Sequence, residues 1–90
     1  MNFEFTQNAW QDFEYWIETD IDIVTKIKEL LKDIRKTNFQ GIGKPEQLKY
    51  DLKGFWSRRI TGEHRLVYKV DGKKGINQKC FIIQCHYHYD

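Results

Sequence analysis

The sequence of 90 residues lacks the features that mark several common classes of protein. No apolar run is long enough to cross a membrane and no signal-peptide pattern is present, so we expect a cytoplasmic protein that does not bind membranes. There are no internal repeats and no low-complexity stretches. The stretch GIGKPE contains two glycines but does not lead into Gly-Lys-Ser/Thr, which excludes a nucleotide-binding loop of that type.

Cysteine is also scarce: Cys80 and Cys85 are the two cysteines of the sequence. On one strand they would lie roughly 16 Å apart on opposite faces, too far apart for a disulfide. Reduced thiols are typical of the cytoplasm. A zinc site made by Cys85, His86 and His88 is also disfavoured, because Cys85 would point away from the two histidines and no fourth ligand is evident. We therefore expect neither a metal nor another cofactor.

The net charge of +2 is spread unevenly along the chain. Residues 1–43 carry five Lys/Arg and eight Asp/Glu, whereas residues 44–79 carry ten Lys/Arg and four Asp/Glu. The basic half also contains several aromatic residues. Cations bind phosphates and flat rings stack on bases, so this combination fits nucleic-acid binding. A solvated surface of lysines explains the charge equally well at this point.

The apolar pattern predicts a short strand at residues 1–5 followed by two helices. The first helix spans residues 7–18 and is capped by Thr6; the second spans residues 21–36 and is capped by Thr19 or Asp20. Charged residues of the second helix, Asp33 among them, are expected in water. The side chains expected to face the core are Ala9, Phe13, Trp16 and Ile17 in the first helix and Ile23, Ile27, Leu30, Leu31 and Ile34 in the second.

Three more strands are predicted after a loop at residues 37–46, namely at residues 55–61, 64–70 and 80–89. Their connections are short, so neighbouring strands should be antiparallel. The sequence therefore predicts a single domain over residues 1–90 with an α+β fold. In this fold an N-terminal strand and a helical hairpin pack on one face of a small, mostly antiparallel sheet.

Alternation along the last strand indicates which side chains face away from the helices, on what we term the outer face of the sheet. The odd-numbered residues from Phe81 to Tyr87 are the more apolar set and are expected in the core. The even-numbered residues from Ile82 to His88 are then expected on the outer face.

Charged side chains are expected to gather on this outer face. Alternation places Arg65 there, beside Ile60 if the preceding turn has two residues and beside Arg59 if it has three. Metal-independent cleavage of RNA needs a base for the attacking hydroxyl, an acid for the leaving oxygen and a fixed cation for the phosphate. The groups available for these tasks, besides the arginines, are Glu46, Lys49 and His88.

Several motifs occur together in a specific order: GIGKPEQLKYDLKGFWSRRITGEHRLVY, a terminal CHYHY, and ETDIDIVTKIKELLKDIRKT in the helical region. In these motifs the chain resembles the YoeB family of toxins, within the RelE-like superfamily, over nearly its whole length. The resemblance implies a RelE-like microbial RNase fold. It also implies a ribosome-dependent messenger-RNA endonuclease, which cuts in the ribosomal A site, leaves a 2′,3′-cyclic phosphate and inhibits translation. Two departures are Asp90, after the usual terminal tyrosine, and a longer hairpin loop, DGKKGINQK.

The resemblance implies a role for each matching residue. Glu46 matches the family's general base, Arg65 its transition-state arginine and His88 its general acid. Tyr89 matches a terminal aromatic residue that positions the substrate. The supporting positions around the phosphate match Lys49 and Arg59, which favours the three-residue turn.

Ordinary explanations exist for the same residues. A loop carboxylate or cation can simply be solvated, Arg65 can form an ion pair with Glu63 or Asp51, and a terminal His and Tyr can be frayed or packed. His64 and His86 match no functional position of the family, so we expect both to be structural.

The resemblance also implies partners: a cognate, YefM-like antitoxin with an acidic, disordered C-terminal segment, the ribosomal A site with its messenger RNA, and operator DNA only through the antitoxin. A homodimer is one option for the free protein. The alternative is a toxin-fold protein with little or no activity that binds antitoxin and ribosome and represses its own operon. The acidic segment is expected on a basic face made by Lys44, Lys49, Lys53, Arg58, Arg59 and Arg65.

Overall fold

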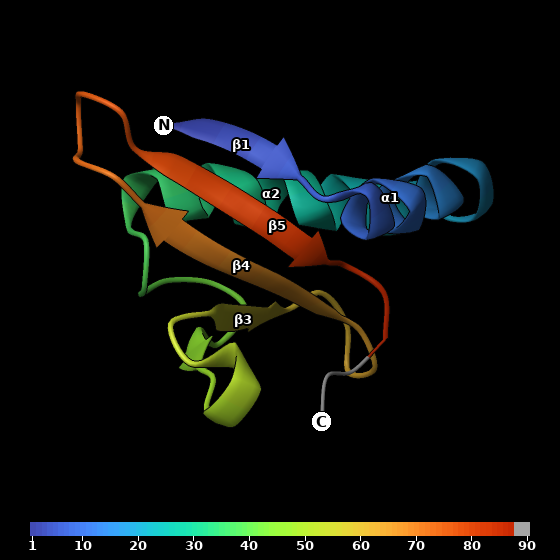
Figure 1. The fold of residues 1–90 in the computed structure, drawn as a ribbon. Coiled ribbons are helices and arrows are strands. Elements are labelled where there is room, and N and C mark those ends of the chain that lie inside the picture. Colours follow the sequence, from blue (N-terminus) through green and yellow to red (C-terminus); the bar gives the residue numbers. More distant parts are fainter. Residues whose placement is uncertain (88–90) are drawn as a thin grey trace.

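The computed structural model describes residues 1–87 of the chain. A five-stranded sheet in the order β1-β5-β4-β3-β2 carries two helices on one face, as Figure 1 shows. The predicted α+β fold is confirmed. In chain order the elements are β1 (Asn2–Phe5), α1 (Gln7–Thr19), α2 (Ile21–Lys36), β2 (Glu46–Gln47), the 3₁₀ turn η1 (Tyr50–Leu52), β3 (Trp56–Arg59), β4 (Arg65–Asp71) and β5 (Lys79–Gln84).

Both helices begin at the residues that the sequence indicates. The Thr6 hydroxyl accepts a hydrogen bond from the Ala9 amide at 3.1 Å. Asp20, one of the two expected caps, accepts from the amides of Asp22 and Ile23 at 3.2 and 3.4 Å. A side-chain oxygen at this position satisfies amides that have no partner inside the helix. None of the helices among residues 1–87 is long and apolar enough to cross a membrane.

The sheet is mixed. β1 runs parallel to β5, whereas the other three neighbouring pairs are antiparallel. The chain between these two strands forms both helices, β2, β3 and β4, and the first and last strands of the chain lie side by side (Figure 1). The two-residue strand β2 was not predicted, because its residues lie at the end of a stretch that reads as a loop.

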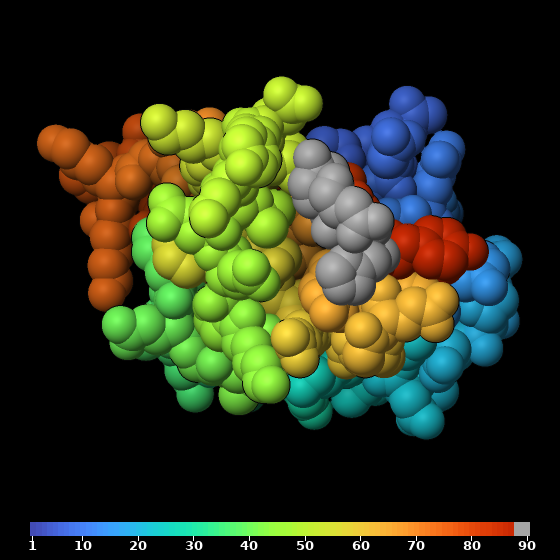
Figure 2. All heavy atoms as spheres, turned by 90° about the horizontal axis from the view of Figure 1, so that it is seen from below, coloured from blue at the N-terminus to red at the C-terminus, as the bar shows by residue number. Residues whose placement is uncertain are grey.

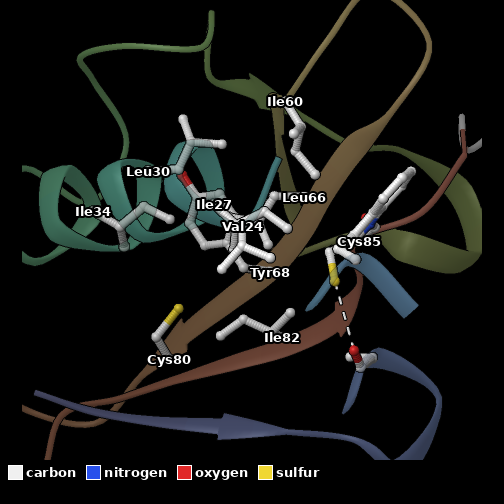
Figure 3. Close-up of a cluster of buried hydrophobic side chains, with 12 residues drawn as sticks. Val24, Ile27, Leu30, Ile34, Ile60, Leu66, Tyr68, Cys80, Ile82 and Cys85 are labelled. Atoms are coloured by element: carbon white, nitrogen blue, oxygen red, sulfur yellow. Dashed lines mark hydrogen bonds between the residues drawn. The ribbon is translucent and has the colours of Figure 1, made fainter. Parts of the chain in front are cut away.

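The core lies between the helices and the sheet (Figure 3). Ile27, Leu30 and Ile34 of α2 are fully buried, as predicted from their spacing, and α1 buries Ala9 and Trp16. Ile17 was assigned to the same stripe, but this prediction is wrong, since its side chain is 49% exposed. The buried apolar stripe of α1 is therefore narrower than the spacing of its apolar residues suggests.

The predicted core face of the last strand is also wrong in part. Cys80 and Ile82 are fully buried, whereas Phe81 and Ile83 are half-buried. Pairing shifts at this point, because Tyr68 faces Ile82 while the preceding Val67 faces Gln84. An extra residue in one strand reverses the alternation beyond it. The bulge explains why Ile82 and Cys85 are both buried, although they would otherwise lie on opposite faces.

The last strand ends earlier than predicted. β5 stops at Gln84, and residues 85–87 continue without strand geometry. The rest of the predicted strand, residues 88 and 89, lies outside the described residues.

A buried arginine ties the loop after α2 to the sheet. Arg58 was predicted on the basic surface, but it is fully buried. Its guanidinium donates to Asp33 Oδ2 at 2.5 Å and to the carbonyls of Thr37 and Gln40 at 2.7 and 2.8 Å, and its Nε donates to the Tyr68 hydroxyl at 3.1 Å. Its positive charge, through this hydrogen bond, lowers the pKa of Asp33. The prediction that Asp33 lies free in water is therefore wrong.

Candidate active site

Four strands place one row of residues side by side on the outer face. Glu46 of β2 pairs with Ser57 of β3, Ser57 with Val67 of β4, and Val67 with Gln84 of β5. Residues paired across antiparallel strands project their side chains from the same face. This row therefore lies opposite the buried pair formed by Arg58 and Leu66. Ser57 and Val67 are themselves buried, so the centre of the outer face is not open to solvent.

The two predicted arginines are neighbours on this face. Arg59 pairs with Arg65, which resolves the ambiguity at the preceding turn in favour of three residues. The turn is closed by the Ile60 amide, which donates to the His64 carbonyl at 3.0 Å. Inside it, the Thr61 hydroxyl accepts from the amides of Glu63 and His64, both at 3.1 Å. Two positive side chains are thus held at one end of the β3–β4 hairpin.

The guanidinium of Arg65 is anchored at this turn. Its Nη1 donates to the carbonyls of Thr61, Gly62 and His64 at 2.9, 3.2 and 3.1 Å. Among residues 1–87 no ion pair of Arg65 with Glu63 or Asp51 is present, so the ordinary explanation by ion pairing does not hold there. One edge of the group is used to hold it in place, while its charge is not neutralised by a carboxylate within that range.

Glu46 stands on the edge strand β2 rather than in a loop. It is exposed and lies two strands away from Arg65. From the usual spacing between and along strands, the two Cα atoms are roughly 12 Å apart. Their side chains project from the same face, so together they can flank a group of phosphate size.

Lys49 is exposed just after β2, where the chain turns into η1. The next residue, Tyr50, has a φ of 57°, in the left-handed region that residues with a Cβ rarely adopt. The amide of Leu48 donates to the Phe55 carbonyl at 2.9 Å, which closes this segment onto itself. In Figure 2 the segment around residues 45–54 (yellow-green) and the turn at residues 60–65 (gold) lie on one side of the molecule.

Two of the predicted site residues, His88 and Tyr89, lie outside the described residues. The chain just before them is well defined by its contacts. The Tyr87 carbonyl accepts a hydrogen bond from the Arg65 amide at 3.0 Å. The described chain thus ends next to the strand that carries one of the predicted site arginines.

His64 and His86 were predicted to be structural, and both belong to one aromatic cluster. Each imidazole lies at 73° to the Trp16 ring with the ring centroids 4.7 Å apart, and the two imidazoles lie 5.1 Å from one another. Tyr15 and Tyr87 stack on the ring of His86 at 4.8 and 3.9 Å. Burial is the main cause that lowers the pKa of His86, although nearby Asp12 opposes it. A half-buried ring stacked between two tyrosines is consistent with a packing role for this histidine.

Within residues 1–87 no three His, Cys, Asp or Glu side chains are grouped as they would be around a metal ion. Cys85, named in the zinc alternative, is fully buried, and its Sγ lies 3.6 Å from the Ala9 carbonyl (Figure 3). Burial raises the pKa of this thiol to about 12. The thiolate that binds zinc is therefore disfavoured at neutral pH.

Residues 5–89 match the family described as the YoeB-like toxin of bacterial type II toxin-antitoxin systems. The chain belongs to the YoeB toxin family. Toxin YoeB of Escherichia coli K12 is 53% identical to it over 89 residues, which cover 99% of this chain and 100% of the relative. The predicted family is thereby confirmed.

Solved structures of YoeB proteins have the same fold. A YoeB/ParE toxin from Agrobacterium tumefaciens superimposes with a TM-score of 0.93 at 47% identity, covering 99% of this chain and 100% of that one. YoeB from Staphylococcus aureus, solved as a dimer and in a heterotetrameric complex with the antitoxin YefM, gives TM-scores of 0.88 and 0.87. Both S. aureus structures are 46% identical and cover 99% of this chain and 98% of theirs. YoeB homologues thus form dimers and bind YefM.

Sequence reasoning missed the contacts that hold residues 85–87. The indole N–H of Trp16 donates to the Cys85 carbonyl at 2.7 Å, and the Cys85 amide donates to Asp12 Oδ2 at 3.1 Å. A tryptophan in the core stripe of a YoeB helix needs a partner for its N–H, and this was an available signal. The identity of that partner depends on the path of the chain after β5, which periodicity does not reveal.

Proposed function

We propose that this YoeB protein is a ribosome-dependent messenger-RNA endoribonuclease that inhibits translation. The observation that supports this most directly is the shared face of Glu46, Arg59 and Arg65, next to the backbone from which His88 and Tyr89 follow. These residue types supply the base, the cations and the acid that RNA cleavage needs. The basic half of the chain suits a substrate that is bound to the phosphate-rich ribosome.

In the proposed reaction, Glu46 takes the proton from a ribose 2′-hydroxyl. The oxygen attacks the adjacent phosphorus, and the bond from phosphorus to the 5′-oxygen of the next nucleotide breaks. His88 gives a proton to that oxygen. The products are a 2′,3′-cyclic phosphate and a free 5′-hydroxyl, so the chemical step uses no metal ion.

The cations act on the phosphate and the terminal ring on the base. Arg65 offsets the charge that develops on the phosphate oxygens, and a guanidinium already held by three carbonyls needs little reorganisation to do so. Lys49 and Arg59 bind the flanking phosphate oxygens. Tyr89 stacks on a base of the codon in the ribosomal A site.

The test is single-turnover cleavage of ribosome-bound messenger RNA. Glu46→Ala and His88→Ala are each expected to slow cleavage by about 10²–10⁴-fold, the usual contribution of a general base or acid. The matched control is Glu29→Ala, which removes an exposed carboxylate from α2. Near-normal rates in both variants would exclude this mechanism and favour a binding module without turnover.

The proposed partner is a YefM-like antitoxin whose acidic, disordered segment binds the basic face. This face is made by Lys44, Lys49, Lys53, Arg59 and Arg65, since Arg58 is buried beneath it. The S. aureus relative, with its dimer and YefM complex, supports both this pairing and a homodimer of the free protein. Operator DNA is then contacted through the antitoxin.

A further inference from the structure

The segment that leaves β5, residues 85–87, is held by several hydrogen bonds although it forms no strand. Side chains of α1 bind the amide and carbonyl of Cys85, as described above. The amide side chain of Gln84 donates to the His86 carbonyl at 2.9 Å. At Tyr87 the amide donates to His64 Nδ1 at 2.8 Å, while the carbonyl accepts from the Arg65 amide at 3.0 Å. Two consecutive residues of the hairpin therefore bind the backbone of Tyr87, the last described residue.

Tyr87 adopts a conformation that needs such support. Its φ is 67°, in the left-handed region that is unfavourable for an aromatic residue. Strained residues persist where surrounding contacts over-determine them, and they are frequent at functional sites. Its ring gives little anchoring by burial, since the residue is 59% exposed. The hydrogen bonds to residues 64 and 65 act directly on its backbone, in addition to the stacking of its ring on His86.

The acceptor of the Tyr87 amide is well oriented. The ring of His64 packs against the buried Trp16 and against His86, with centroids 4.7 and 5.1 Å away. Trp16 is itself fixed by its bond to the Cys85 carbonyl. To accept from an amide, Nδ1 must present its lone pair, so this hydrogen bond requires the ring form that has its proton on Nε2.

We propose that His64 is a positioning residue for the cleavage reaction: by accepting the Tyr87 amide it sets the backbone direction from which His88 and Tyr89 follow. The inference rests on the proposed function. His88 is bonded directly to Tyr87, and consecutive Cα atoms are about 3.8 Å apart. The neighbouring residue Arg65 supplies both the other hydrogen bond to Tyr87 and the transition-state cation. The same two-residue unit thus holds both the guanidinium and the backbone that leads to the acid.

Two substitutions separate this role from simple packing. His64→Asn keeps an acceptor, because Oδ1 of asparagine lies close to the place of Nδ1, but removes the ring. His64→Phe keeps a ring beside Trp16 but has no acceptor. If His64 positions the terminus, the Asn variant retains cleavage within about threefold and the Phe variant loses about 10–100-fold, within the range of misplaced catalytic groups. A packing role predicts the opposite order and would overturn the proposal.

The kinetic parameter that changes in the Phe variant also distinguishes the two roles. In single-turnover cleavage of ribosome-bound messenger RNA, the Phe variant is expected to lower the rate at saturating ribosome. The ribosome concentration that gives half the maximal rate should stay unchanged. A Phe variant that changes only this half-saturating concentration would contradict positioning of the acid.

A spectroscopic readout tests the contact without relying on activity. In the full-length, nitrogen-15-labelled chain, a scalar coupling should connect the Tyr87 amide nitrogen with His64 Nδ1, and the Tyr87 amide should exchange slowly with deuterium. Both signals should vanish in the Phe variant, while slow exchange persists in the Asn variant. Wild-type cleavage with an unprotected Tyr87 amide would overturn the positioning role alone. A wild-type chain that cleaves no ribosome-bound RNA would overturn the proposed function, whatever the amide shows.

Discussion

Arg58 was predicted from the sequence to lie on the surface, but its side chain is buried in the fold. It follows Ser57 and precedes Arg59 in a strand whose alternate residues face the helices and the outer face. Alternation places Arg59 outward and Arg58 inward, beside Leu66. A buried guanidinium is tolerable only where its donors find acceptors, and here a carboxylate, a hydroxyl and several loop carbonyls provide them.

We predict that Arg58→Met lowers the free energy of unfolding by about 3–5 kcal/mol, since it leaves the half-buried Asp33 carboxylate, the Tyr68 hydroxyl and several loop carbonyls without their donor. The matched control, Arg59→Met, removes the exposed neighbour and should change stability by less than about 0.5 kcal/mol. Chemical denaturation at neutral pH measures both. Equal effects would show that the buried network contributes nothing specific.

The same pair gives a pH dependence with a definite sign. The pKa of Asp33 lies below its ordinary value of 3.8 because Arg58 stabilises the carboxylate. The stabilisation that the ionised Asp33 gives to the folded state is therefore present above about pH 4 and is lost as the pH falls through the lowered pKa. In the Arg58→Met variant, stability should fall less steeply with acidification below this pH, as measured by denaturation at pH 4 and below.

At the scale of elements, the loop between α2 and β2 decides where Glu46 stands. The carbonyl of Gly43 accepts from the Arg59 amide at 2.6 Å, three residues before Glu46. Gly43 has a φ of +81°, and a Cβ there would lie 2.8 Å from Leu30 Cδ2 and 3.1 Å from both Arg58 Cβ and the Arg59 carbonyl oxygen. The loop is thus pressed against the core and the sheet at a point that has room for glycine alone.

We predict that Gly43→Ala destabilises the protein by about 1–3 kcal/mol more than Gly75→Ala, because only the former adds a clash in a packed region. Gly75 is a matched control, since its φ is +80° and a Cβ there would meet nothing within 4 Å. Thermal unfolding of the two variants gives the difference. The Gly43 variant should also cleave more slowly, because its clash displaces the approach to Glu46; a variant as stable as the Gly75 control would contradict this packing.

How far the elements could be predicted depended on the kind of signal. The helices were predicted to within a residue, because Thr6 and Asp20 combine a capping side chain with a regular apolar stripe. The faces of β5 could not be predicted, since Cys80, Phe81, Ile82 and Ile83 are all apolar and alternation therefore has no preference. The bulge that decides between them is a property of the pairing with β4.

The candidate site was predicted from motif resemblance more than from physical reasoning. Alternation alone placed Arg65 on the outer face, and the register of β3 with β4 then placed Arg59 beside it. Alternation could not place Glu46, because an edge strand of two residues is too short to show a periodic pattern in the sequence. The acceptor role of His64 was equally hidden, because its donor lies 23 residues away, on a segment without regular structure.

At the scale of the whole molecule, charge is divided between the layers. The acidic first half forms β1 and both helices, whereas the basic second half forms the hairpins and the segment before them. Two lysine pairs stand far apart on the basic side: Lys49 and Lys53 flank η1 near the candidate site, and Lys73 and Lys74 occupy the loop at the opposite end of β4 (Figure 1). An acidic partner steered to the site should respond to the first pair far more than to the second.

We predict that the association rate of the acidic antitoxin segment falls steeply with ionic strength, because the Debye length shrinks from about 10 Å at 0.1 M salt to about 3 Å at 1 M. Steered association at low salt can exceed the neutral rate by roughly 10²–10³-fold. The double variant with Lys49→Glu and Lys53→Glu should lose most of this enhancement and of its salt dependence. The double variant with Lys73→Glu and Lys74→Glu changes the net charge equally and should lose much less. Stopped-flow association across a salt series distinguishes the two. Equal losses would mean that net charge alone attracts the partner, and a rate that is flat with salt would remove the electrostatic argument for binding at the basic face.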